Sequence, residues 1–245
     1  MENLTRKQRE IQEREALILE VARKMLIERG YLGVTMDRIA QAIEYSKGTV
    51  YQHFSSKEDV LVALAGETTR TRADLFRRAA AFNGTSRERM TGIGVADELF
   101  VRLFPQHWHA EQIIRAASIQ SKATRDHLKT LESTEAECFD AVSVIIMDAI
   151  GDGDLIPEGH EIPQTIAYGL WSLSFGSHFI AASNPNLGSL AMEDESAMLN
   201  RNYHALLDGY GWQPLSSAHD YIAVQDRIRR EVFPEESRRV GLIEN

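Results

Sequence analysis

Apolar residues recur every three or four positions along almost the whole chain, which is the spacing of one face of an α-helix. In the first segment, for example, Leu17, Val21 and Met25 share one stripe. No stretch shows the strict alternation of apolar and polar residues that marks a half-buried strand. The pattern therefore predicts an all-α fold.

Stop signals and helix caps divide this pattern into separate helices. Gly30 ends the first helix, Pro105 stops the fifth and Gly151 closes the seventh. Thr85 and Glu88 have the spacing of a capping box, which marks a helix start. The expected helices cover residues 5–28, 35–42, 46–54, 55–81, 85–104, 106–121, 123–150, 162–183, 192–209 and 216–233, followed by a charged tail.

The second and third expected helices are each about two turns long and are joined by a turn of about three or four residues, which is the spacing of a helix-turn-helix. The second helix of such a motif enters the major groove of DNA. The apolar residues assigned to its buried face are Ile39, Ala40, Ile43, Val50 and Phe54.

The remaining side chains of this motif carry groups that suit DNA. Lys47 offers a cation to a phosphate, Gly48 allows close approach of the backbone, and Gln52 has the amide geometry that reads adenine. The predicted DNA-binding residues are Thr35, Ser46, Lys47, Gly48, Thr49, Tyr51, Gln52, His53 and Lys57. The alternative is an ordinary pair of short helices whose polar residues are only solvated.

Two runs resemble the N-terminal domain of the tetracycline-repressor (TetR) family: GYLGVTMDRIA, residues 30–40, and SKGTVYQHFSSKEDVL, residues 46–61. The likeness covers residues 16–65, and it implies a dimeric transcriptional regulator, usually a repressor. It further implies a variable helical C-terminal domain whose small-molecule effector commonly releases the DNA, and the same DNA-facing positions except Gln52. The family usually has glycine where this chain has Glu44, and a side chain in a left-handed turn costs about 1 kcal/mol.

The net charge of −9 argues by itself against a nucleic-acid partner, but its distribution changes the picture. Residues 1–60 hold ten basic and ten acidic residues, so all the excess acidity lies in the rest of the chain. Because affinity for DNA depends on local phosphate contacts, the global charge does not exclude it. We expect a helix-turn-helix DNA-binding domain over 1–56 and a C-terminal effector-binding and dimerisation domain over 57–245.

The segment from Ile162 to Met192 contains no Asp, Glu, Lys or Arg, but polar and small residues interrupt it, so we expect a buried or dimer-facing helix and no membrane span. Apolar and small residues repeat along one of its faces at the two-turn spacing of packed helices. The predicted dimer interface comprises Ile166, Gly169, Leu173, Gly176, Ile180, Leu199, Tyr203 and Leu206. An intrachain core would show the same stripe.

Aromatic residues of the larger domain are candidates for an effector pocket, because such pockets are mostly apolar with a few polar groups. The candidates are Phe100, Phe104, Trp108, Arg115, Phe139, Trp171, Phe175 and His178. They predict a lipophilic or aromatic effector, with Arg115 available to an anionic head. The alternatives are ordinary core packing for each aromatic residue and a surface ion pair for Arg115.

The sequence as a whole predicts a sequence-specific regulator that binds a pseudo-palindromic operator as a homodimer and is released by a small-molecule effector. The charged start lacks the apolar core of a signal peptide, which favours the cytoplasm. The single cysteine, Cys138, excludes an intrachain disulfide framework. No catalytic motif, cofactor loop or metal-binding spacing is found, so we expect no enzyme. The alternative is a helical ligand-binding or scaffold protein that has lost DNA binding.

Overall fold

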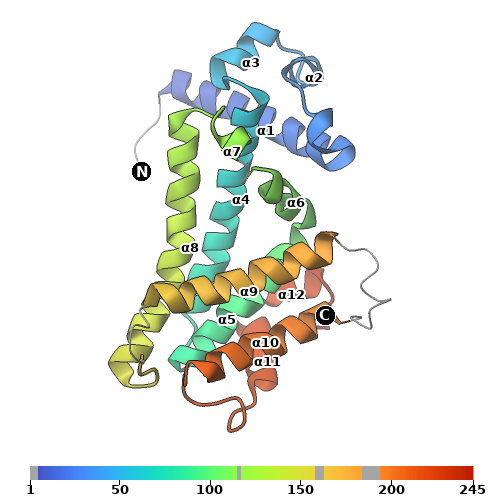
Figure 1. The fold of residues 1–245 in the computed structure, drawn as a ribbon. Helices are drawn as coiled ribbons and strands as arrows, with labels where there is room; N and C mark the ends of the chain where they lie inside the picture. The colour runs from blue at the N-terminus through green and yellow to red at the C-terminus, as the bar shows by residue number, and fades with distance from the viewer. Residues whose placement is uncertain (1–4, 115–116, 158–162, 184–193, 245) are drawn as a thin grey trace. The chain divides into compact units, whose positions relative to one another are not determined.

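The computed structural model describes residues 5–114, 117–157, 163–183 and 194–244, and for 106, 107, 109, 110, 113, 117 and 118 only the backbone. Over these ranges every regular element is a helix, which confirms the predicted all-α fold (Figure 1). The helices are α1 Arg6–Gly33, α2 Met36–Ala42, α3 Lys47–His53, α4 Lys57–Ala80, α5 Ser86–Leu103, α6 Pro105–Ile114, α7 Ala117–Gln120, α8 Arg125–Asp152, α9 Pro163–Ser183, α10 Glu195–Gly209, α11 Tyr221–Glu231 and α12 Pro234–Arg239.

Side-chain caps explain where several of these helices begin. Thr35 and Ser46 each accept a hydrogen bond from a backbone N–H of the following turn, which satisfies one of the unpaired donors of a helix start. Thr85 and Glu88 form the predicted capping box at the start of α5. Within α1, Gly30 has φ 65° and interrupts the helix at the predicted stop.

The helix expected over 106–121 is described as α6 and α7, which lie on either side of residues 115–116, outside the described residues. One element differs from the prediction. The tail contains a further helix, α12, where only a charged tail was expected. Pro234 lies in its first turn with two glutamates, and two arginines lie in its last, which is the arrangement that proline geometry and the helix dipole favour.

The chain packs as two compact units. Unit 1 comprises residues 1–70 and 106–134, and unit 2 comprises residues 71–105 and 135–245. Helices α4 and α8 each contribute to both units. The predicted boundary at residue 56 concerns function and stays a prediction, whereas packing groups the start of α8 with the N-terminal helices.

The core of unit 1 contains the apolar face predicted for the helix-turn-helix. Ile39, Ala40, Val50 and Phe54 are buried, and Ile43 packs against them with part of its surface exposed. Residues of the later segment join the same core: Ile114, Ile119 and Leu131. Helices α6 to α8 therefore help to hold the helix-turn-helix in place.

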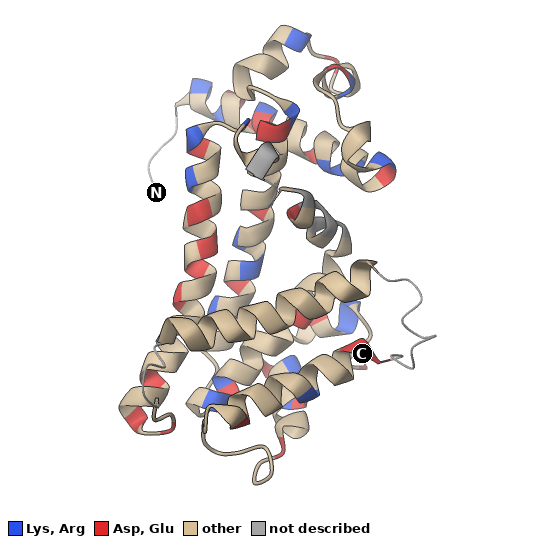
Figure 2. Ribbon diagram, viewed as in Figure 1, with Lys and Arg blue, Asp and Glu red and all other residues tan. Residues whose placement is uncertain are grey.

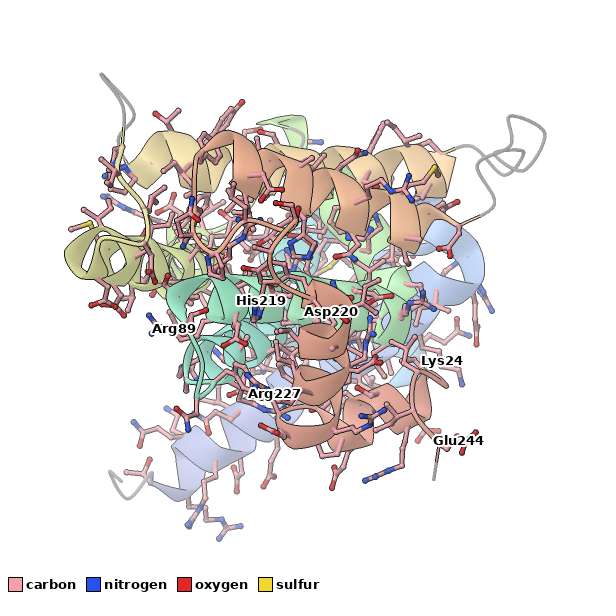
Figure 3. The ribbon with its side chains drawn as sticks, turned by 90° about the horizontal axis from the view of Figure 1, so that it is seen from below. Lys24, Arg89, His219, Asp220, Arg227 and Glu244 are labelled. Atoms are coloured by element: carbon pink, nitrogen blue, oxygen red, sulfur yellow. The ribbon has the colours of Figure 1, made fainter. Side chains whose placement is uncertain are left out.

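The core of unit 2 includes the C-terminal helices, since α11 and α12 pack against α5. The segment is also tied by charge, because His219 and Arg227 lie 3.4 and 3.2 Å from the carboxylate of Glu88 (Figure 3). Arg78 of α4 pairs with Glu236 of α12. The C-terminal segment is thus part of the folded unit. In the part of the chain that the structure describes, no helix has the length and apolar character needed to span a membrane.

Candidate nucleic-acid interface

Helices α2 and α3 pack against each other as the predicted helix-turn-helix. The Thr35 hydroxyl accepts from the backbone N–H of Arg38 at 3.3 Å, and the Ser46 hydroxyl accepts from that of Thr49 at 3.1 Å. Both caps lie where the sequence predicted the two helices to start. Thr35 and Ser46, which the sequence predicts to contact DNA, therefore also cap the two helices of the motif.

The turn between the two helices is left-handed at Glu44, where φ is 57°. The N–H of Tyr45 donates to the carbonyl of Ala40 at 3.1 Å, and that of Glu44 donates to Gln41 at 3.3 Å. These two bonds close α2 in the way that usually selects glycine at the left-handed position. Glu44 therefore adopts the strained left-handed conformation that the sequence predicts, and α2 and α3 still pack as a helix-turn-helix.

One face of α3 points away from the core of unit 1. Ser46, Lys47, Gly48, Tyr51 and Gln52 are exposed. Thr49 is half-buried, while Val50 and Phe54 are buried on the opposite side. The exposed set offers a hydroxyl, an ammonium, a phenol and an amide, which are the groups that contact phosphates and base edges.

Gly48 is not required by the packing of the chain itself. A Cβ atom at this position would meet only the Ser46 hydroxyl, at 3.7 Å, which is an ordinary contact. Glycine inside a helix costs about 0.5–1 kcal/mol relative to alanine. A glycine that the fold does not need, at the centre of an exposed polar face, favours a partner that approaches the backbone closely.

Two lysines of the motif have partners within the protein. The Lys47 ammonium lies 2.6 Å from a carboxylate oxygen of Asp37, and both side chains are exposed. The hydrogen bond to Asp37 raises the pKa of Lys47, so the lysine stays charged. The Lys57 ammonium lies 3.9 Å from the centre of the Tyr31 ring, a cation–π contact.

The side chain of His53 packs within unit 1 against α1, and its predicted contact with DNA stays a prediction. Its side chain is only 6% exposed, and its Nδ1 lies 3.1 Å from a carboxylate oxygen of Glu15 in α1. His53 follows Val50 by three positions, so it shares the face of α3 that packs on the domain. Its role in this structure is to hold α3 against α1.

The predicted dimer stripe lies partly inside the chain. Ile166 and Tyr203 are buried in the core of unit 2, and the Tyr203 hydroxyl donates to the carbonyl of Met90 at 3.1 Å. A Cβ atom at Gly169 would lie 2.6 Å from the hydroxyl of Tyr210 in α10. These three residues therefore serve the packing of α9 on α10 within one chain, and the intersubunit contact of the stripe stays a prediction.

The other members of the predicted stripe are only partly covered. Leu173 and Leu206 pack at the edge of the core, and Leu199 is half-buried. At Gly176 a Cβ atom would meet nothing within 4 Å, and Ile180 is an exposed large apolar residue.

The predicted effector residues fall into different surroundings. Trp108 is buried in unit 1, and Phe100 is buried in unit 2 beneath the Arg72 guanidinium, 4.1 Å from its ring centre. Phe104 is half-buried beside Phe100, with the two ring centres 5.7 Å apart. Arg115 lies outside the described residues.

The remaining candidates gather on α8 and α9. Trp171 lies 5.9 Å from Phe139 and 6.0 Å from Phe175, measured between ring centres. Tyr168 and Phe179, which the sequence did not single out, extend this aromatic row along α9.

His178 belongs to a largely covered polar cluster that the sequence did not reveal. Its Nε2 lies 3.1 Å from Asp97, and the Arg72 Nε lies 4.0 Å from the same carboxylate. Burial raises the pKa of Asp97, but the hydrogen bond with His178 and the Arg72 charge outweigh it and hold the pKa below its usual range. The only signal in the sequence is the pair of carboxylates, Asp97 and Glu98, within the otherwise apolar run at 93–100 of α5.

The N-terminal region matches a known family model. Residues 18–64, which contain the whole helix-turn-helix, match the model described as bacterial regulatory proteins, tetR family. The chain is 38% identical over 66 residues to the HTH-type transcriptional repressor AcnR of Corynebacterium diphtheriae, a match that covers 27% of this chain and 35% of AcnR. The chain thus spans about a third of the length of that relative.

A longer match is found with the HTH-type transcriptional repressor Rv1474c of Mycobacterium tuberculosis. The two are 30% identical over 166 residues, covering 61% of this chain and 85% of that protein. Among solved structures, the transcriptional regulator FadR from Bacillus subtilis, in complex with stearoyl-CoA, has a similar fold, with a TM-score of 0.62 and 15% identity over 79% of this chain and 98% of that one. Together with the helix-turn-helix geometry, these similarities show that the chain belongs to the tetR family of bacterial regulatory proteins.

Proposed function

We propose that this protein is a sequence-specific DNA-binding transcriptional regulator that represses from a pseudo-palindromic operator as a homodimer and is released by a small-molecule effector. The exposed polar face of α3, centred on Gly48, carries this proposal. The face has side chains that can read bases, and its glycine has no packing reason within the chain. The residues proposed to contact DNA are Thr35, Ser46, Lys47, Gly48, Thr49, Tyr51, Gln52 and Lys57.

The test is selection of bound duplexes from a random pool, followed by affinity measurements at several salt concentrations. Two-fold dimers read half-sites about one helical turn apart, so we expect a selected sequence with two related halves at about 10-bp spacing. A protein that enriches no sequence and binds no duplex at low ionic strength would contradict the proposal. That outcome would favour the alternative, a helical ligand-binding protein without DNA binding.

Replacing Lys47 by alanine tests the phosphate contact of α3. We expect weaker binding to every duplex and a salt dependence whose slope is lower by about one, since one phosphate contact is lost. The matched control is Lys24→Ala, which removes an exposed lysine of α1 outside the motif and should leave the slope unchanged. An unchanged slope in Lys47→Ala would argue that Lys47 keeps its pairing with Asp37 in the complex.

We propose that the second subunit of the dimer packs against the outer face of α9. This helix contains no Asp, Glu, Lys or Arg (Figure 2), and Tyr168 and Phe179 on it are 62% and 45% exposed. Contiguous exposed aromatic surface on a protein of this kind is typical of a partner interface. Gly176 and Ile180 of the predicted stripe stay in the proposed interface, whereas Ile166, Gly169 and Tyr203 do not.

For the effector we propose an apolar molecule with a polar head, bound in the C-terminal domain. Phe139, Trp171 and Phe175 supply the apolar surface, and the Arg72–Asp97–His178 cluster supplies the polar groups of unit 2. Stearoyl-CoA, with which the Bacillus subtilis FadR was solved, is the first probe to test. A rise in melting temperature together with release from the selected duplex would support this class, and the absence of both would contradict it.

A further inference from the structure

The carboxylate of Asp59, at the start of α4, is completely buried and accepts hydrogen bonds from the residue four positions before it and from a segment more than sixty positions later. Ser55 donates to its Oδ2 from the backbone N–H at 2.8 Å and from the hydroxyl at 3.1 Å. Thr124 donates to its Oδ1 from the backbone N–H at 2.8 Å and from the hydroxyl at 2.9 Å. His127 Nδ1 lies 2.7 Å from the same oxygen. We name Asp59, Thr124 and His127 the clasp.

The clasp holds a charged group in the interior of unit 1. Burial raises the pKa of Asp59, but hydrogen bonds from Thr124, His127 and Ser55 outweigh it, so the pKa lies below its usual range. The carboxylate is therefore ionised at neutral pH and acts only as an acceptor, which makes His127 Nδ1 the donor. Removing one donor leaves a buried charge short of a partner, which costs more than an ordinary hydrogen bond.

The clasp also contacts the end of α3. The His127 ring stacks on the Phe54 ring, with ring centres 5.1 Å apart and planes at 20°. Phe54 closes α3, and its N–H donates to the carbonyl of Val50 at 3.0 Å. His127 thus contacts both the residue that caps the end of α3 and the first turn of α4.

Neighbouring contacts fix the same segment to the start of α4. The Ser56 hydroxyl donates to the carbonyl of Lys122 at 2.9 Å, and the Lys122 ammonium lies 3.6 Å from Glu58. His127 and Thr124 lie at the start of α8, which continues through the chain into unit 2. The orientation of α3 is therefore mechanically linked to the position of the first turn of α8.

We infer that Thr124 and His127 are positioning residues for DNA binding: through Asp59 and Phe54 they hold α3 at the angle that the operator requires. Neither residue contacts DNA. The inference rests on the proposed function, because it concerns the affinity of α3 for duplex DNA.

The test compares Thr124→Val and His127→Phe with wild type on a duplex selected by the wild-type full-length protein. Valine keeps the shape of threonine without the hydroxyl, and phenylalanine keeps the stack on Phe54 without the donor. We expect each variant to lose about tenfold in affinity, the size of one buried charge-assisted bond, with an unchanged salt slope, because no phosphate contact is removed. The matched control is Thr130→Val, since the Thr130 hydroxyl bonds only to the carbonyl of Asp126 in its own helix.

Two further measurements separate positioning from general stability. His127→Asn keeps a side-chain N–H donor and should recover part of the affinity lost in His127→Phe. Amide hydrogen exchange at Val50 to Phe54 should speed up in Thr124→Val, while exchange in α5 of unit 2 stays as in wild type. Variants that bind within about twofold of wild type, with unchanged exchange in α3, would overturn the inference. A wild-type protein that selects no duplex would instead overturn the proposed function.

Discussion

At the scale of single residues, the structure shows that one polar side chain can serve the fold, the site or both. Thr35 and Ser46 cap helices and are also among the residues proposed to contact DNA. Their helix-starting role could be read from the sequence, because a cap acts within one turn. The interior position of His53 could not, because it depends on Glu15, which lies 38 positions earlier in the chain.

Glu44 provides a test of backbone strain at one residue. Its φ of 57° is unfavourable for a residue with a Cβ atom. Glu44→Gly should raise the free energy of unfolding by up to about 1 kcal/mol, because glycine accepts this conformation. Glu44→Ala keeps the Cβ atom and should give no comparable gain in urea unfolding; an equal gain in both variants would contradict the strain explanation.

His204 should make stability depend on pH. It is buried in unit 2, and neither ring nitrogen has a hydrogen-bond partner among the described residues. Burial, with the nearby Arg87 cation, lowers the pKa of His204 to about 4. In the unfolded chain the pKa is about 6.5, so the unfolded state binds more protons between these values and stability falls as pH drops from about 6.5 to about 4.

The loss over this window should approach about 3 kcal/mol. In His204→Phe, which keeps an aromatic ring beside Tyr221, this part of the pH dependence should disappear. Urea unfolding at a series of pH values measures it. A variant with the same acid sensitivity as wild type would show that other groups cause the loss.

For whole helices, the spacing of hydrophobic residues predicts where each helix lies in the chain, but it does not predict which other helix packs against it. Helix α9 illustrates this difference. The repeat at Ile166, Gly169 and Leu173 predicts a dimer interface, with an intrachain core as the alternative, and in the structure α10 of the same chain packs against α9. The repeat of apolar residues along a helix indicates that one face of the helix is covered, but it does not indicate which other surface covers that face.

We expect the C-terminal helices to contribute to the free energy of unfolding. Phe233 is fully buried in the core of unit 2, with the Arg78 guanidinium 4.7 Å from its ring centre. Phe233→Ala should lower the free energy of unfolding by about 3–5 kcal/mol, because it leaves a cavity. Ile222→Ala, at a residue of α11 that is 68% exposed, is the control and should change it by less than about 0.5 kcal/mol. Equal effects would show that this segment is not part of the core.

At the scale of the whole molecule, the chain packs as two units whose membership crosses the sequence order. Residues 106–134 join the helix-turn-helix unit although more than thirty residues of unit 2 precede them. The clasp lies within this rearranged unit. A change in α6 to α8 therefore acts on the same core that holds α3.

We expect two copies of the chain to associate through α9. Gly176→Leu places a side chain where a Cβ atom meets no atom of the described residues within 4 Å, so the subunit should fold normally. If α9 forms the interface, sedimentation should show a shift from dimer to monomer, and affinity for a two-half operator should fall with it. Gly151→Leu, which is equally open but lies at the end of α8, is the control. A dimer of wild-type stability in Gly176→Leu would exclude this part of α9 from the interface.

The sequence alone determined the helical fold, most helix boundaries, the helix-turn-helix and the exposed polar residues of α3, because each depends on interactions within a few residues along the chain. It also indicated the strain at Glu44, since backbone conformation is a local property. Only the tertiary structure decided that His53 faces inward, that Ile166 and Tyr203 belong to the core, and that Asp59 is held by Thr124 and His127. Those contacts join residues far apart in the sequence, where the identity of the partner is set by packing and not by local pattern.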